Sequence, residues 1–68
     1  MVYYIKNKET NKPIRLLDKT IEEVNDIKDA TLVSGPILGL KRLQLEFIRL
    51  NLSRDKYKIV GNPNLTIE

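Results

Sequence analysis

Basic side chains in the second half of this 68-residue chain are the first candidates for binding chemistry. Residues 35–68 hold six Lys and Arg against three Asp and Glu, whereas residues 1–34 hold six of each, so the second half carries the whole net charge of +3. Ammonium and guanidinium groups bind phosphates, and an exposed tyrosine ring stacks on a base. The candidate nucleic-acid-binding residues are Lys41, Arg42, Arg49, Arg54, Lys56, Tyr57 and Lys58.

Two observations make nucleic-acid binding the alternative rather than the main prediction. On a helix, Arg42, Glu46 and Arg49 are spaced three and four residues apart, which is typical of ordinary surface ion pairs. The sequence also contains no recognised DNA- or RNA-binding motif. A small basic nucleic-acid-binding protein that uses its C-terminal half therefore stays the second hypothesis.

Catalytic chemistry has little support in the composition. The chain contains neither cysteine nor histidine, which excludes disulfides, zinc sites of the Cys/His type, thiol nucleophiles and imidazole bases. Acid–base catalysis would depend on the carboxylates, and no spacing among them singles out a pair. We predict a non-enzymatic protein with no catalytic residues, no metal and no cofactor.

The Leu-rich segment 37–54 supports two secondary-structure interpretations. As a helix it places one apolar stripe at spacings of three and four residues, formed by Leu40, Leu43, Phe47 and Leu50. As a strand it would alternate through Leu43, Leu45 and Phe47. Strong helix formers fill the segment, and it is longer than a typical strand of about 5–6 residues. We therefore predict a helix.

A helix at 37–54 would have a second apolar face, formed by Leu38, Leu45, Ile48 and Leu52. A helix that is apolar around most of its girth is expected to be buried on nearly all sides. Either the C-terminal strands wrap this second face, or another protein or a second copy of the chain covers it. The four residues are our candidate protein interface, and we expect a dimer or higher oligomer or a protein partner.

The remaining segments predict strands and one short helix around the Leu-rich helix. Residues 2–6 and 14–17 favour an N-terminal β-hairpin, and residues 57–60 and 65–67 favour a C-terminal one. Thr20 and Glu23 match a capping box, which predicts a helix over residues 21–28. A short strand at residues 30–33 follows. The predicted fold is a small α+β domain of order ββαβαββ.

Length and composition bound the class of protein. Residues 1–68 are expected to form one domain with a core too small to supply more than about 3–5 kcal/mol. The first residues do not resemble a signal peptide, and no apolar run is long enough for a membrane span, so we expect a cytoplasmic protein with no membrane partner. Abundant Lys, Ile and Asn with a single Ala indicate an AT-rich genome. The main hypothesis is a protein-binding or self-associating module, such as an accessory or regulatory protein of a phage or plasmid of a low-GC bacterium.

Overall fold

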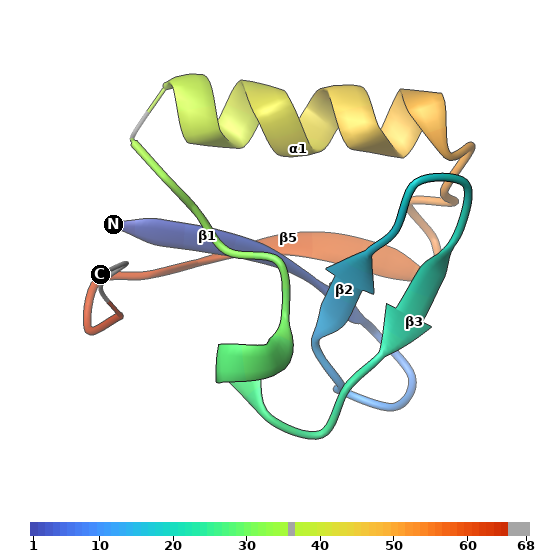
Figure 1. Cartoon of the computed structure of the whole chain (residues 1–68), viewed down its shortest axis with the longest axis horizontal. Coiled ribbons are helices and arrows are strands. Elements are labelled where there is room, and N and C mark those ends of the chain that lie inside the picture. The colour runs from blue at the N-terminus through green and yellow to red at the C-terminus, as the bar shows by residue number, and fades with distance from the viewer. Residues whose placement is uncertain (36, 66–68) are drawn as a thin grey trace.

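The computed structural model describes residues 1–35 and 37–65, and in it short strands gather on one side of an α-helix (Figure 1). This arrangement confirms the predicted mixed α+β class. The elements in chain order are β1 (Val2–Asn7), β2 (Ile14–Leu16), β3 (Ile21–Glu23), the 3-10 turn η1 (Ile27–Asp29), β4 (Val33–Ser34), α1 (Leu38–Arg49) and β5 (Tyr57–Asn62).

The main sheet has three antiparallel strands in the order β4-β1-β5. Its longest ladder joins β1 to β5 and pairs Val2 with Asn62 and Asn7 with Tyr57. The strand predicted at 57–60 is therefore confirmed, but its partner is β1 and not a strand that follows it. Leu65 lies outside any strand, and residues 66 and 67 of the predicted hairpin fall outside the described residues.

The second strand pair is the hairpin β2-β3, which corrects two predictions. The expected hairpin between the first two strands is reduced to one isolated bridge, Lys6 to Pro13, because the ladder of β2 runs with β3. The helix predicted over residues 21–28 is wrong. The Thr20 carbonyl accepts a hydrogen bond from the Leu17 N–H at 2.9 Å, which closes a tight turn. Pairing with β2 then outweighs the local capping signal.

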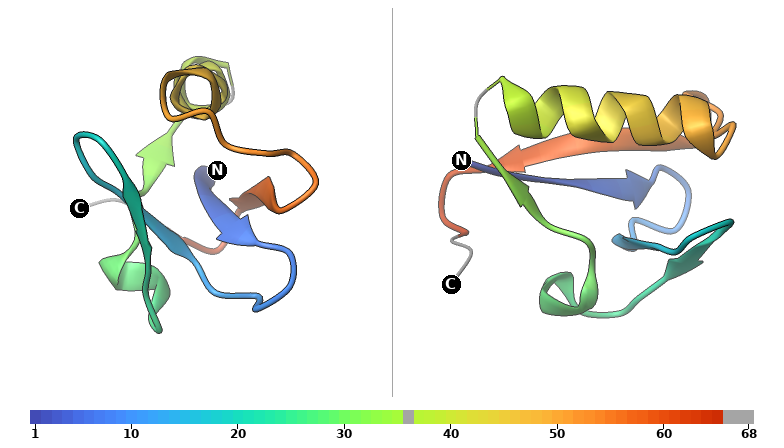
Figure 2. Two further views of the ribbon diagram at one scale, coloured as in Figure 1. Left: turned by 90° about the vertical axis from the view of Figure 1, so that its right-hand side faces the viewer. Right: turned by 45° about the horizontal axis from the view of Figure 1, so that its top comes forward.

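The hydrophobic core lies between the strands and the inner side of α1. It consists of Ile5, Ile14, Val33, Leu43 and Phe47, all of them buried. Figure 2 (left) shows α1 almost end-on, with the strands grouped on one side of it. One face of the strands thus covers one face of the helix, and the opposite face of α1 is left uncovered.

The helix prediction for the Leu-rich segment is confirmed, although α1 ends at Arg49 and not at residue 54. Asn51 adopts the left-handed conformation (φ 53°) just past the helix end. The Leu52 N–H donates to the Phe47 carbonyl at 2.9 Å, and the Asn51 N–H donates to the Ile48 carbonyl at 3.2 Å. This hydrogen-bond pattern is a Schellman C-cap, which reverses the chain direction.

Candidate binding surfaces

The outer face of α1 exposes three large apolar side chains. Leu38 is 80 % exposed, Leu45 is 64 % exposed and Ile48 is 77 % exposed. Their spacing of seven and three residues places them on the side of the helix opposite the buried Leu43 and Phe47. We call Leu38, Leu45 and Ile48 the outer apolar face. These are three of the four residues predicted from the sequence as a protein interface.

Leu52, the fourth predicted interface residue, lies elsewhere. The Schellman C-cap turns the chain after Asn51, and Leu52 packs, partly buried, against the core. A hydrophobic contact between this position and Phe47 commonly accompanies such a cap. The 3.6-residue period that would place Leu52 beside Leu45 ends with the helix at Arg49. The sequence pattern therefore included Leu52 in the interface wrongly.

The charges around the outer apolar face are cationic. Lys41 and Arg42 are both exposed, and the first turn of α1 contains no acidic residue. Glu46 is the acidic residue of the helix, and its carboxylate is paired with Arg49 at 2.5 Å. The face therefore presents apolar side chains and positive charge that has no ion-pair partner in the described part of the chain.

The predicted basic residues do not form one surface. Arg49 donates to the Leu17 carbonyl at 3.2 Å and to the Asp18 carbonyl, so its guanidinium is held on the β2-β3 turn. Arg42 lies two helical turns before Arg49 and shares its side of the helix. Arg54 and Lys58, by contrast, lie on the β5 side of α1.

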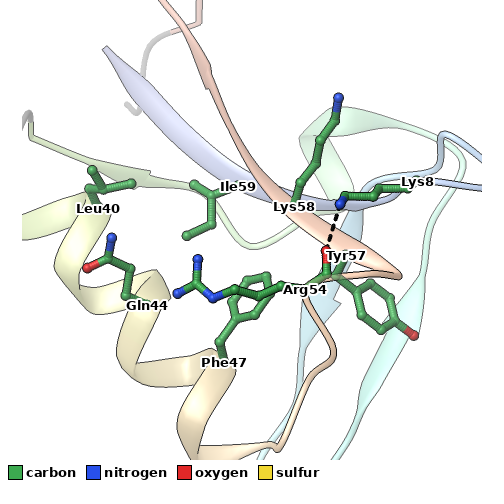
Figure 3. Close-up of a pocket in the computed structure, with 8 residues that line it drawn as sticks. All are labelled: Lys8, Leu40, Gln44, Phe47, Arg54, Tyr57, Lys58 and Ile59. Atoms are coloured by element: carbon green, nitrogen blue, oxygen red, sulfur yellow. Dashed lines mark hydrogen bonds between the residues drawn. The ribbon is translucent and has the colours of Figure 1, made fainter.

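An open cavity of about 360 Å³ lies between α1 and β5 (Figure 3). It brings together three of the predicted nucleic-acid residues, Arg54, Tyr57 and Lys58. We call this cavity the α1-β5 groove. Its lining residues are Lys8, Leu40, Gln44, Phe47, Arg54, Tyr57, Lys58 and Ile59.

Three of the groove residues are cations, and none is a carboxylate. The Lys8 ammonium donates to the Arg54 carbonyl at 2.6 Å, and the Arg54 guanidinium lies 5.2 Å from the centroid of the Phe47 ring. The ion pairs found among the described residues involve Arg15, Lys28 and Arg49, none of which lines the groove. Lys8 was missed from the sequence because it lies 46 residues before Arg54.

The aromatic rings near the groove are poorly placed for base stacking. Phe47 is only 4 % exposed and is covered by Arg54. Tyr57 is partly buried against the core, and the Lys56 ammonium lies 5.7 Å from its ring centroid. Both rings already have neighbours on their faces.

Acidic groups do not gather into a metal-binding cluster in the part of the chain that the structure describes. Among residues 1–35 and 37–65, no helix is long and apolar enough to cross a membrane. Asn7 is a buried polar residue, and its side-chain oxygen accepts hydrogen bonds from the Glu9 and Thr10 N–H groups, so it shapes the loop after β1. Comparisons with protein-family models, curated proteins and solved structures find no match for this chain.

Proposed function

We propose that this protein is a small non-enzymatic protein-binding module that docks its partner on the outer apolar face of α1. The observation that supports this function is the exposure of Leu38, Leu45 and Ile48 on one side of a single helix. Scattered exposed apolar residues are ordinary, but a stripe at helical spacing beside a polar rim is typical of protein interfaces. We propose no catalytic activity.

The charges favour a partner that carries carboxylates. Lys41 lies among the three side chains of the outer apolar face on the helix surface, and Arg42 lies beside them. Neither has an acidic partner among the described residues, so a partner surface with Leu or Ile beside Asp or Glu would complement them. The 12-residue α1 is about 18 Å long. Such a short helix supplies less than the roughly 800 Å² per partner of a standard interface. We therefore infer a transient complex.

Self-association is the other form of this proposal. Two copies that met through α1 would bring Lys41 and Arg42 of both chains into one interface, and the single acidic residue of α1, Glu46, is already paired with Arg49. Like charges in one interface oppose association. We therefore favour a separate acidic partner over a homo-oligomer.

The test uses a synthetic amphipathic helical peptide with Leu in its core positions and Glu in the flanking positions. Fluorescence anisotropy should show binding to the Glu peptide and none to a peptide with Lys in place of Glu. The double variant Leu45→Gln/Ile48→Gln should bind about tenfold more weakly or worse, because two apolar contacts are lost. Leu17→Gln changes an exposed apolar residue of the β2-β3 turn, outside the outer apolar face, and should bind as the wild type does.

Two outcomes would decide against the acidic partner. Equal binding of the Glu and Lys peptides would show that charge does not select the partner. Unchanged binding of the double variant would show that the outer apolar face is not the binding site. Sedimentation of the free protein completes the experiment. A dimer that dissociates in the double variant would assign the same face to a second copy.

Nucleic-acid binding remains the second candidate function because of the cationic α1-β5 groove. Its support is weaker than the sequence suggested. The Arg49 guanidinium is hydrogen-bonded to the β2-β3 turn, and Arg42 lies on the same side of α1 as Arg49, away from the groove. The rings of Phe47 and Tyr57 already have cationic neighbours on their faces. Electrophoretic shift with single-stranded and duplex DNA and RNA at low salt tests it, since phosphate contacts weaken steeply as salt rises.

For the biological setting we propose a cytoplasmic accessory or regulatory protein encoded by a phage or plasmid of a low-GC bacterium. The supporting observations are the small size and a composition rich in Lys, Ile and Asn with one Ala. Codons for the first three are AT-rich and those for Ala are GC-rich. Expression from the native gene with localisation by fractionation tests this setting.

A further inference from the structure

The outer edge of β5 is an unpaired strand edge. In the sheet order β4-β1-β5, no described strand lies beyond β5. The Lys8 N–H donates to the Lys56 carbonyl at 2.8 Å, just before the β1-β5 ladder begins. Antiparallel ladders alternate, so every second residue of β5 directs its backbone groups to β1 and the others direct theirs outward. The outward residues are Tyr57, Ile59 and Gly61.

Ile59 and Gly61 offer both of their backbone groups at this edge. The Tyr57 N–H is already used, because it donates to the Ser53 carbonyl at 2.9 Å. The N–H and C=O groups of Ile59 and Gly61 remain, at the two-residue spacing that an added antiparallel strand requires. The edge of β5 can therefore hold a short extended peptide by main-chain hydrogen bonds.

The α1-β5 groove lies against this same edge. Lys58 and Ile59 are consecutive residues of β5, and both line the groove, with the Ile59 side chain directed toward α1 and the Lys58 side chain directed away from it (Figure 3). A groove lined by consecutive residues of β5 runs beside this strand. Leu40 and Phe47 of α1 form the opposite apolar wall.

The charge of the groove selects the side chains of such a peptide. Lys8, Arg54 and Lys58 line it, and no carboxylate of residues 1–35 and 37–65 does. Edge lysines discourage pairing with neutral or cationic strands, and the same positive charges favour a strand that carries Asp or Glu. We propose that the α1-β5 groove binds an acidic peptide in extended conformation, which adds to β5 as a fourth strand of the main sheet.

A peptide fits these features better than a nucleic acid does. Main-chain pairing at Ile59 and Gly61 has no counterpart in a phosphate backbone, and the rings of Phe47 and Tyr57 are covered on the faces that a base would need. The groove is a different surface from the outer apolar face of α1. Variants of the two surfaces can therefore fail independently.

The test is fluorescence anisotropy with a labelled peptide in which Glu and Val alternate. The matched peptides carry Lys in place of Glu, or carry N-methyl groups on the amides of one edge, which prevent strand pairing and leave the charge unchanged. We expect the Glu peptide to bind at least about tenfold more tightly than the Lys peptide. N-methylation should weaken binding about tenfold or more, since it removes two or more hydrogen bonds.

Protein variants locate the site. Arg54→Gln/Lys58→Gln should weaken binding about three- to tenfold, as expected for partly exposed charge pairs. Lys41→Gln removes one positive charge outside the groove and should bind as the wild type does. Leu45→Gln/Ile48→Gln should also leave this affinity unchanged. Circular dichroism confirms that each variant is folded, and amide chemical-shift changes on peptide binding should centre on Ile59 and Gly61.

Three results would overturn the proposal. The first is an absence of binding by the Glu peptide at about 1 mM, where even a weak complex of roughly 4 kcal/mol is half formed. The second is equal binding of the N-methylated peptide, which would leave charge alone as the attraction. The third is tighter binding of oligothymidylate through Arg54 and Lys58, which would assign the groove to single-stranded nucleic acid.

Discussion

Gly39 lies where the first turn of α1 crosses β4. A Cβ atom at this position would lie 2.7 Å from the Ser34 carbonyl oxygen and 2.9 Å from the carbonyl carbon. These are backbone atoms, so the helix would have to move away from the strand. The close approach explains why a residue with poor helix propensity occupies the second position of α1.

We predict that Gly39→Ala destabilises the protein by about 1–3 kcal/mol, the range for overpacking at a tight contact. An exposed helical glycine replaced by alanine would instead stabilise by about 1 kcal/mol, so the sign of the effect decides. Urea unfolding gives the free energy, with Lys41→Ala as the exposed control in the same helix. A stabilised Gly39→Ala variant would show that α1 does not contact β4 as described.

Arg49 links two elements that are distant in sequence. Its guanidinium donates to the Leu17 and Asp18 carbonyls in the β2-β3 turn and pairs with Glu46 at 2.5 Å. This arrangement gives Arg49 a structural role, although the sequence pattern placed it among the nucleic-acid candidates. The guanidinium fork suits two adjacent carbonyls, whereas a lysine ammonium can reach fewer of them.

We expect Arg49→Ala to lower the free energy of unfolding by about 1 kcal/mol, a modest value because the side chain is 44 % exposed. Arg49→Lys should recover part of this loss. Arg42→Ala removes the same charge from the same side of α1 and should stay within about 0.5 kcal/mol of the wild type. Equal losses at Arg42 and Arg49 would contradict the contact with the β2-β3 turn.

At the level of elements, the segment after Thr20 shows a local helix-capping pattern that is overruled by strand pairing between β2 and β3. Thr20 and Glu23 match a capping box, but Glu23 lies in β3 and its carboxylate accepts a hydrogen bond from the Thr10 hydroxyl. Thr20 contributes its backbone carbonyl to the turn, and its side chain is exposed. The hydroxyl of Thr20 therefore has no capping role.

Thr20→Ala tests this correction directly. A lost N-cap costs about 1 kcal/mol, whereas an exposed turn side chain costs less than about 0.5 kcal/mol. We predict the smaller value in thermal or urea unfolding. A loss near 1 kcal/mol, accompanied by helical chemical shifts at Ile21 and Glu22, would restore the helix.

The elements that the sequence predicted well are those with a strong local period. The Leu-rich helix and the strand at 57–60 follow from residue type and spacing alone. The strand partners do not, because β1 pairs with β4 and β5, whose residues lie far along the chain. The β2-β3 pairing was missed for a related reason, since each of these strands has only three residues and too short a pattern to oppose the capping signal.

The candidate surfaces were predicted in part. Helical spacing placed Leu38, Leu45 and Ile48 together on a face that the structure leaves exposed. The length of the helix was overestimated, because the left-handed conformation of Asn51 leaves no trace in hydropathy. The sequence placed Arg42 and Arg54 together among the candidate nucleic-acid-binding residues, because both are basic. In the structure they lie on two different sides of α1.

For the whole molecule, the charges have little influence on stability. Each ion pair among the described residues is partly exposed to solvent, and exposed pairs contribute about 0–1 kcal/mol each. The cations of the α1-β5 groove repel one another, and salt screens this repulsion. Stability therefore rests on the buried core of Ile5, Ile14, Val33, Leu43 and Phe47.

We predict that the free energy of unfolding by urea changes by less than about 1 kcal/mol between about 0.02 and 0.5 M NaCl. Binding of an acidic peptide in the groove should weaken over the same range, because it depends on unpaired charges. Urea is used as the denaturant because guanidinium is itself a salt. A large loss of stability in salt would mean that the ion pairs, and not the core, hold the fold.

The position of β1 in the main sheet has a consequence for how the chain folds during synthesis. β1 leaves the ribosome before both of its neighbours, β4 and β5. Until Tyr57–Asn62 is synthesised, the sheet around β1 cannot be completed, so we expect the apolar residues of β1 to stay exposed in the nascent chain. Translation arrest before β5 should leave β1 accessible to protease, and release of the chain should protect it.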